Sequence, residues 1–146
     1  MSNKRIILLT GAGFTKNFGG FLGIEIWDKI LYHENIQNCP WIKNKMLGSE
    51  DFNYESLYTS IINSPLSGDA NNVNAIDSAV KDAYDLQNKM VLSDSCKNNS
   101  VIGRFSDFIV NNVSCFFTLN QDLFIEKHIL EKSKIATHYY LPHMWH

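Results

Sequence analysis

Two amides and a carboxylate follow one another at the end of an apolar segment, as Asn120, Gln121 and Asp122. Phe116 and Phe117 just before them are typical of a buried strand, and an amphipathic stretch comes directly after. Open α/β sheets place their ligand chemistry at the carboxyl ends of strands, just before a helix. The alternative is structural, because Asn120 or Asp122 could simply cap the helix that follows.

A second candidate is the glycine-rich segment that follows the first apolar run. It comprises Gly11, Ala12, Gly13, Phe14 and Thr15. Glycines at a strand-to-helix turn let the backbone approach an anion, and the amides that follow can bind a pyrophosphate. The segment is neither a full dinucleotide fingerprint, since Lys16 replaces the third glycine, nor a Walker loop. A tight turn without a ligand explains it equally well.

The elements that position these two segments follow from the hydrophobic periodicity. Residues 5–10 and 114–119 read as strands, and residues 135–141 as a third. Helical spacing of apolar residues predicts helices that begin near residue 22, near residue 49 or 51, and near residue 102. It also predicts a long helix over about residues 73–92 and another over residues 121–132. An interruption is expected at Cys39-Pro40, and polar loops at residues 63–72 and 93–100. Three strands are few for a doubly wound sheet with five helices.

Composition favours one ordinary globular domain that covers residues 1–146, with a net charge of −2. This charge offers no general attraction to nucleic acid or to anionic membranes. No signal sequence or apolar stretch of membrane-spanning length is visible, so we expect no membrane association. Cys39, Cys96 and Cys115 are scattered, which fits a reducing cytoplasm, and Cys115 is expected in the core.

Together the two segments resemble the Sir2-like (sirtuin) superfamily, whose members open with a strand and GAG[hydrophobic][Ser/Thr] and later carry T-x-N-x-D. The longer stretches around the two segments, GAGFTKNFGGFLG and FFTLNQDLFIEKH, together with Trp27, are similar to the sequences of bacterial Sir2-like antiphage-defence effectors. The zinc-ribbon cysteines and the PDFR-like segment of protein deacylases are missing. The resemblance implies a Rossmann-like α/β domain that cleaves NAD⁺ at the nicotinamide–ribose bond, with water as the final acceptor and no bound metal.

The resemblance also implies roles for individual residues. Asn120 would position the attacking water beside the ribose, which suits glycosidic cleavage through an oxocarbenium-like state. Asp122 would bind near the same ribose or fix the loop, unless it is only a helix cap, and Thr118 would support that loop. The segment from Gly11 to Thr15 would hold the diphosphate and the adjoining ribose of NAD⁺.

The family's catalytic base is a histidine that is usually followed by glycine, and this chain has no His-Gly pair. His138, in the third expected strand, is the first candidate for the base and His143 the second. A site made of His138, His143 and His146 lacks acidic partners, so we expect no metal there. His128 is expected at the surface.

The expected fold is therefore α/β, a parallel Rossmann-like sheet flanked by helices, with a helix-rich middle and an incomplete end. An open sheet edge and the apolar Met144 and Trp145 favour burial against another chain. The leading hypothesis is an NAD⁺-hydrolysing defence effector, active only in a homo-oligomer or with a separate sensor or regulatory subunit. The alternatives are a non-catalytic nucleotide-binding subunit and, less favoured, a protein deacylase.

Overall fold

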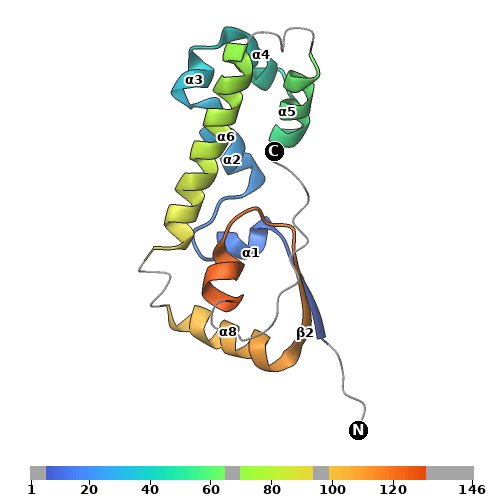
Figure 1. Ribbon diagram of the computed structural model, residues 1–146, viewed down its shortest axis with the longest axis vertical. Coiled ribbons are helices and arrows are strands. Elements are labelled where there is room, and N and C mark those ends of the chain that lie inside the picture. The colour runs from blue at the N-terminus through green and yellow to red at the C-terminus, as the bar shows by residue number, and fades with distance from the viewer. Residues whose placement is uncertain (1–5, 65–69, 94–98, 131–146) are drawn as a thin grey trace.

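The computed structural model describes residues 6–64, 70–93 and 99–130 of the 146-residue chain. It is a mixed α/β structure, rich in helix, with one pair of parallel strands (Figure 1). The elements run in the order β1 (Ile6–Thr10), α1 (Ala12–Lys16), α2 (Gly23–Leu31), α3 (Glu34–Gln37), α4 (Pro40–Leu47), α5 (Tyr54–Ile62), α6 (Ala70–Val91), α8 (Ser100–Asn112), β2 (Val113–Thr118) and η2 (Glu126–Leu130), the last being a π-helix.

β1 and β2 pair in parallel although nearly the whole described chain separates them. The register aligns Leu8 with Phe116 and Thr10 with Thr118. Parallel strands need a crossover, and here every helix from α1 to α8 belongs to it. The expected mixed α/β fold with parallel strands is thus confirmed in its coarse form. The third expected strand, residues 135–141, lies outside the described residues.

The described residues form two lobes, each with its own apolar core (Figure 1). The helical lobe consists of α2 to α6, and Trp27, Ile30 and Ile61 are among its buried side chains. The strand lobe consists of β1, α1, α8, β2 and η2, and is filled by Ile109, Phe124 and their neighbours. Because α6 ends with the buried Val91 in the second core, this helix connects the two lobes.

Helix starts follow ordinary capping chemistry. The Asn53 side chain accepts hydrogen bonds from Glu55 N and Ser56 N at the start of α5, and Asn99 accepts one from Val101 N at the start of α8. The expected interruption at Cys39-Pro40 is present, since Cys39 lies outside any helix, between α3 and α4, and Pro40 is the first residue of α4. Proline suits that position because its missing N–H would have no helical partner there.

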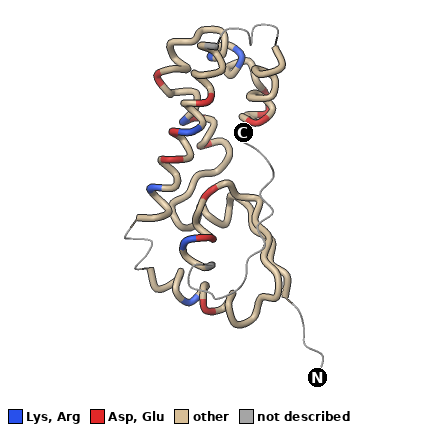
Figure 2. Tube along the Cα trace, in the orientation of Figure 1, with Lys and Arg blue, Asp and Glu red and all other residues tan. Residues whose placement is uncertain are grey.

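Charged side chains of both signs are scattered over the helices, and neither strand carries one (Figure 2). Strands without charge and rich in apolar residues are typical of parallel sheets, which are usually covered on both faces. Within the described residues, no helix combines the length and apolarity that a membrane crossing requires.

Candidate functional site

The two sequence motifs meet at the carboxyl ends of β1 and β2. Thr10 is the register partner of Thr118, and Leu119 N donates a further hydrogen bond to Thr10 O at 3.0 Å. The glycine loop (residues 11–15) and the Asn120 loop (residues 119–123) therefore leave the sheet side by side. Because β1 and β2 are parallel, both loops lie at the same edge of the sheet, where open α/β sheets place their ligands.

A direct hydrogen bond joins the two loops, donated by Asn120 Nδ2 to Thr15 Oγ1. Thr15 is fully buried, and the Asn120 backbone N–H is fixed by Thr118 Oγ1 at 3.1 Å. Thr118 thus supports the loop, as the sequence predicts. These contacts hold the Asn120 side chain in one orientation, across residues that lie 105 positions apart in the sequence.

Two oxygen atoms at this edge are buried and have no hydrogen-bond partner among the described residues, Asn120 Oδ1 and Thr10 Oγ1. Buried polar groups in proteins are nearly always paired with protein, water or ligand. Sequence reasoning missed Thr10, although a threonine that closes an otherwise apolar strand is a visible signal. The pair of unpartnered oxygens marks a place where a polar ligand would complete the hydrogen bonding.

The glycines of the glycine loop have no packing reason to be glycine. Gly11 has φ −132° and ψ −175°, which any residue adopts, and a Cβ on Gly11 or Gly13 would meet nothing within 4 Å. Open space alone is not specific, because Gly103 in α8 has it too. At the end of a strand beside unpartnered oxygens, however, bare backbone is what a close ligand requires.

The aromatic ring of Phe14 faces inward. Its ring centroid lies 5.4 Å from that of Phe18, 5.1 Å from Phe105 and 5.7 Å from Phe124. This cluster attaches the glycine loop to α8 and to the segment before η2. Within the described residues, Phe14 acts as the anchor of the loop, while its predicted contact with NAD⁺ stays a prediction.

Asp122 is buried and serves the protein itself. Its Oδ1 accepts from Phe124 N at 2.9 Å, as a helix cap does, and its Oδ2 accepts from Gln87 Nε2 at 3.2 Å. Gln87 Oε1 in turn accepts from Phe21 N at 3.3 Å. Asp122 therefore has the helix-capping role that was the structural alternative. Gln87 is a second residue that the sequence reasoning missed. Its signal was a glutamine within the apolar face of α6.

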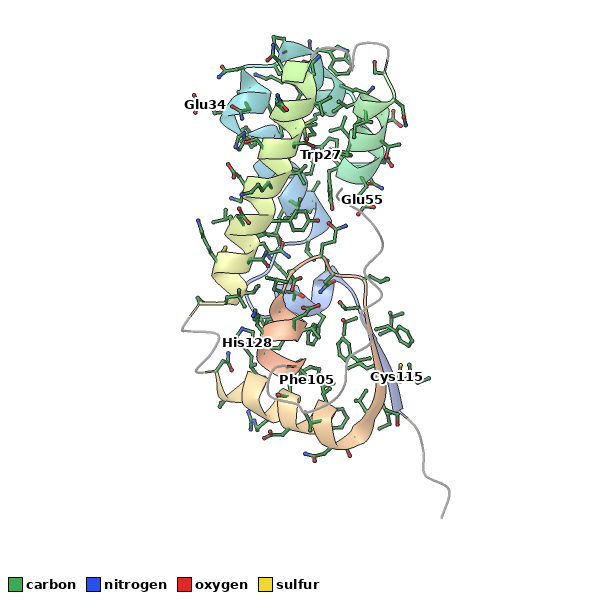
Figure 3. The ribbon with its side chains drawn as sticks, in the orientation of Figure 1. Trp27, Glu34, Glu55, Phe105, Cys115 and His128 are labelled. Carbon is green, nitrogen blue, oxygen red and sulfur yellow. The ribbon has the colours of Figure 1, made fainter. Side chains whose placement is uncertain are left out.

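The expected bases His138 and His143 lie outside the described residues, as do His146 and the apolar Met144 and Trp145. The expectation that His128 is at the surface is wrong, because it is 3% exposed and its Nε2 lies 2.7 Å from Val91 O (Figure 3). In the wide turn of η2, His128 lies against Phe124, with ring centroids 4.9 Å apart.

Glu126 is the first residue of η2 and follows Asp122 by four positions. Its Oε2 is buried without a partner among the described residues. Burial raises the pKa of the Glu126 carboxyl, and the negative charge of Asp122 raises it further. Within the same residues, no group of three or more His, Cys, Asp or Glu side chains is arranged to hold a metal ion.

Cys115 is also not where the sequence predicts it. It is exposed rather than in the core, because strand alternation places it with Ile7 on the outer face of the sheet (Figure 3). Ile7 and Phe117 on that face are 66% and 55% exposed. The inner face, with Leu8 and Phe116, packs on the strand-lobe core.

No protein-family model, curated protein or solved structure matches this chain. The likeness to the Sir2-like superfamily therefore stays a prediction from two motifs. The arrangement of those motifs in space is the new observation, and it is the basis of the proposal below.

Proposed function

We propose that this chain is a Sir2-like NAD⁺ glycohydrolase subunit of a bacterial antiphage defence system, with a Rossmann-like sheet that residues beyond β1 and β2 extend. The observation that carries the proposal is the pairing of the glycine loop with the Asn120 loop, in which Asn120 Oδ1 is buried and has no hydrogen-bond partner among the described residues. A buried acceptor held rigidly beside bare backbone supports binding of a hydroxyl or a water at that point.

The reaction fits this kind of site. Water attacks the ribose carbon that bears nicotinamide, the carbon–nitrogen bond breaks, and its electron pair neutralises the pyridinium ring. The products are ADP-ribose, nicotinamide and one proton. Because the leaving group departs neutral, the main task of the protein is to hold the ribose and orient the water. Asn120 Oδ1, as an acceptor, suits the orientation of that water.

Each segment has a place in the proposed complex. Gly11, Ala12 and Gly13 present their backbone N–H groups to the diphosphate. The first hydrogen bond of the helical turn is made by the next residue, since Phe14 N donates to Gly11 O at 2.8 Å. Thr15 fixes Asn120 and does not itself need to touch the ligand. Asp122 supports the loop through Phe124 N and Gln87. His138 remains the proposed base.

Activity in this proposal depends on assembly. A constitutive NAD⁺ hydrolase would exhaust the cofactor of its own cell, so we propose that the chain acts as a homo-oligomer, with a sensor or regulatory subunit, in the cytoplasm. The test is to incubate NAD⁺ with the protein, alone and with the products of neighbouring genes, and to quantify nicotinamide and ADP-ribose by chromatography.

The variant Asn120→Ala should lower NAD⁺ hydrolysis at least about 100-fold, as expected when a water-orienting group is lost. The variant should stay folded, with a loss of stability of about 1–3 kcal/mol because the buried Thr15 hydroxyl loses the hydrogen bond from Asn120. The matched control is Asn111→Ala, which removes an exposed amide whose Nδ2 donates to Asp107 O within its own helix at 2.7 Å. Equal hydrolysis by Asn120→Ala and the control would contradict the proposal.

A second candidate is a non-catalytic nucleotide-binding subunit. It is favoured because both described histidines are engaged away from Asn120. His128 is hydrogen-bonded to Val91 O, and His33 is hydrogen-bonded to Asp82 in the helical lobe. Gly13→Ala and Gly103→Ala are a matched pair, because a Cβ enters open space at both positions. A difference in NAD⁺ binding between them therefore reports on the glycine loop, independently of turnover. NAD⁺ binding that is lost only in Gly13→Ala, in a wild type without turnover under any condition, would support this candidate.

A further inference from the structure

The Asn120 loop is connected to the helical lobe by the side chain of Gln121. Tyr54 OH donates to Gln121 Oε1 at 2.6 Å, and Gln121 Nε2 donates to Glu55 Oε1 at 2.9 Å. Tyr54 and Glu55 are the first two residues of α5, at the end of that helix that faces the strand lobe (Figure 3). One exposed amide thus bridges the two lobes.

The helix end that binds Gln121 is itself well fixed. Asn53 Oδ1 caps α5 through Glu55 N at 3.0 Å, and Tyr54 OH is hydrogen-bonded to Tyr84 OH of α6. The rings of Tyr54 and Tyr84 are also in edge contact, with centroids 5.9 Å apart. Burial raises the pKa of the Tyr54 hydroxyl, so this group keeps its proton and remains a donor.

The residues that follow Gln121 are held separately by α6. Asp122 Oδ2 accepts from Gln87 Nε2 at 3.2 Å, and Leu123 N donates to Asn88 Oδ1 at 3.0 Å. Gln121 therefore stands between the anchored part of the loop and Asn120. Its own side chain is what ties this intermediate position to α5.

We propose that Gln121 is a positioning residue, whose amide, held between Tyr54 and Glu55, fixes the backbone that orients Asn120 toward Thr15. The position of α5 thereby sets the geometry of the site. This inference rests on the proposed function of Asn120. It also identifies α5 as the element through which a partner subunit would change activity, because a shift of its first turn breaks both bonds to Gln121.

Glutamine suits this position because it offers an acceptor to Tyr54 and a donor to Glu55 from one planar group. In Gln121→Glu, the donor is replaced by an oxygen that faces the Glu55 carboxylate, and the two negative charges repel. Combining Gln121→Glu with Glu55→Gln restores the bond in the opposite direction, while Tyr54 still donates. The double variant should therefore recover the properties of the wild type. A defect caused by a general loss of packing would not recover.

The experiment uses the full chain and two measurements, steady-state NAD⁺ hydrolysis under the conditions that activate the wild type, and hydrogen–deuterium exchange of residues 118–124 without NAD⁺. Gln121→Glu should lower kcat about 10-fold or more, with little change in KM, and should speed exchange in that segment. The double variant should recover both values. Fast exchange that the second substitution does not slow, or unchanged exchange in Gln121→Glu, would overturn the proposal.

Tyr54→Phe and Tyr58→Phe provide a matched pair. Tyr58 lies one turn further along α5, and its hydroxyl donates to Asp77 Oδ1 at 2.7 Å, away from the Asn120 loop. Tyr54→Phe should speed exchange in residues 118–124 and Tyr58→Phe should not; equal effects would overturn the proposal. A wild type without NAD⁺ turnover would contradict the proposed function alone, since the exchange measurements still decide whether Gln121 fixes the loop.

Discussion

Thr15 is the residue at which the candidate site and the protein core meet. Its hydroxyl accepts from Asn120 Nδ2, and its carbonyl accepts from Phe18 N at 2.9 Å and Gly20 N at 3.0 Å. The side chain is fully buried, so its hydroxyl cannot turn to water if Asn120 is removed. The orientation of the Asn120 side chain thus depends on the packing of the core around Thr15.

At the same scale, Glu126 predicts a dependence of stability on pH. Its raised pKa means that the folded state keeps the carboxyl proton to higher pH than the unfolded state, whose reference value is 4.5. The stabilising contribution is therefore complete below that value and is lost as pH rises through the folded pKa. Glu126→Gln should consequently lose less stability than the wild type between pH 4.5 and neutrality.

Thermal unfolding across that pH interval measures this difference. The control is Glu50→Gln, at an exposed position before α5, which should follow the wild-type pH profile. If the Glu126→Gln profile also runs parallel to that of the wild type, the unpartnered Glu126 Oε2 does not influence folding.

At the scale of elements, the turn after α1 depends on Gly19 and Gly20. Gly19 has φ +91°, and a Cβ on Gly20 would lie 2.6 Å from Thr15 Cγ2 and 3.0 Å from Thr15 O. This close approach lets the chain turn directly from α1 toward α2 while it covers Thr15. The turn is therefore part of what holds the glycine loop in place.

Gly20→Ala should accordingly destabilise the fold by about 1–3 kcal/mol, the usual cost of forcing atoms into a packed interior. Gly103→Ala is the matched control, because its Cβ enters open space and the residue lies within α8. There alanine should be neutral or stabilising by up to about 1 kcal/mol through its higher helix propensity. Urea unfolding of both variants measures the difference, and similar midpoints would contradict the packing argument.

Helix and strand prediction succeeded where the apolar period was strong and failed where it was weak. The stripes of α5 and α8 and the uncharged runs of β1 and β2 were visible in the sequence. In α4 only Ile42 and Met46 are buried, and this spacing is too sparse to indicate a helix. After Asp122 a helix was expected, and part of it is the π-helix η2. His128 lies four residues after Phe124 and is buried with Ile125 and Ile129, so the helical spacing of these residues already indicated burial, and the expectation of a surface position overlooked it.

The candidate site was predictable as far as its two motifs reach. Parallel strands bring their carboxyl ends together, so the meeting of Thr15 and Asn120 followed from the strand assignments. Gln87 was indicated only by its place in the apolar face of α6. Tyr54 and Glu55 could not be predicted, because they reach the site from α5 through tertiary packing. No short-range pattern records such contacts.

At the scale of the whole molecule, the outer face of the sheet is an apolar surface in need of a cover. Leu9 and Phe117 are register partners, 63% and 55% exposed, and Leu119 is 76% exposed. Neither strand carries a charge, so two copies of this face can meet without repulsion between like charges. We therefore expect a second copy of the chain to cover this face in the proposed homo-oligomer.

Phe117→Glu should shift the protein toward the monomer by placing a charge within that contact, and sedimentation velocity at several concentrations measures the shift. Tyr32→Glu is the control, since Tyr32 is 76% exposed at the end of α2 in the helical lobe. If both variants sediment like the wild type, this face is not the contact between subunits.

The parallel pairing of β1 with β2 also orders events during synthesis. The contacts of the helical lobe join neighbouring helices and become possible as soon as α6 has been made, whereas β1 must wait for β2. Long-range pairing of this kind is slow, because the entropy of a large loop is lost before any stabilising contact forms. A nascent chain that stops before Val113 therefore contains α2 to α6 of the helical lobe but only the glycine loop of the candidate site. The two halves of that site can meet only after β2 and the Asn120 loop have been made.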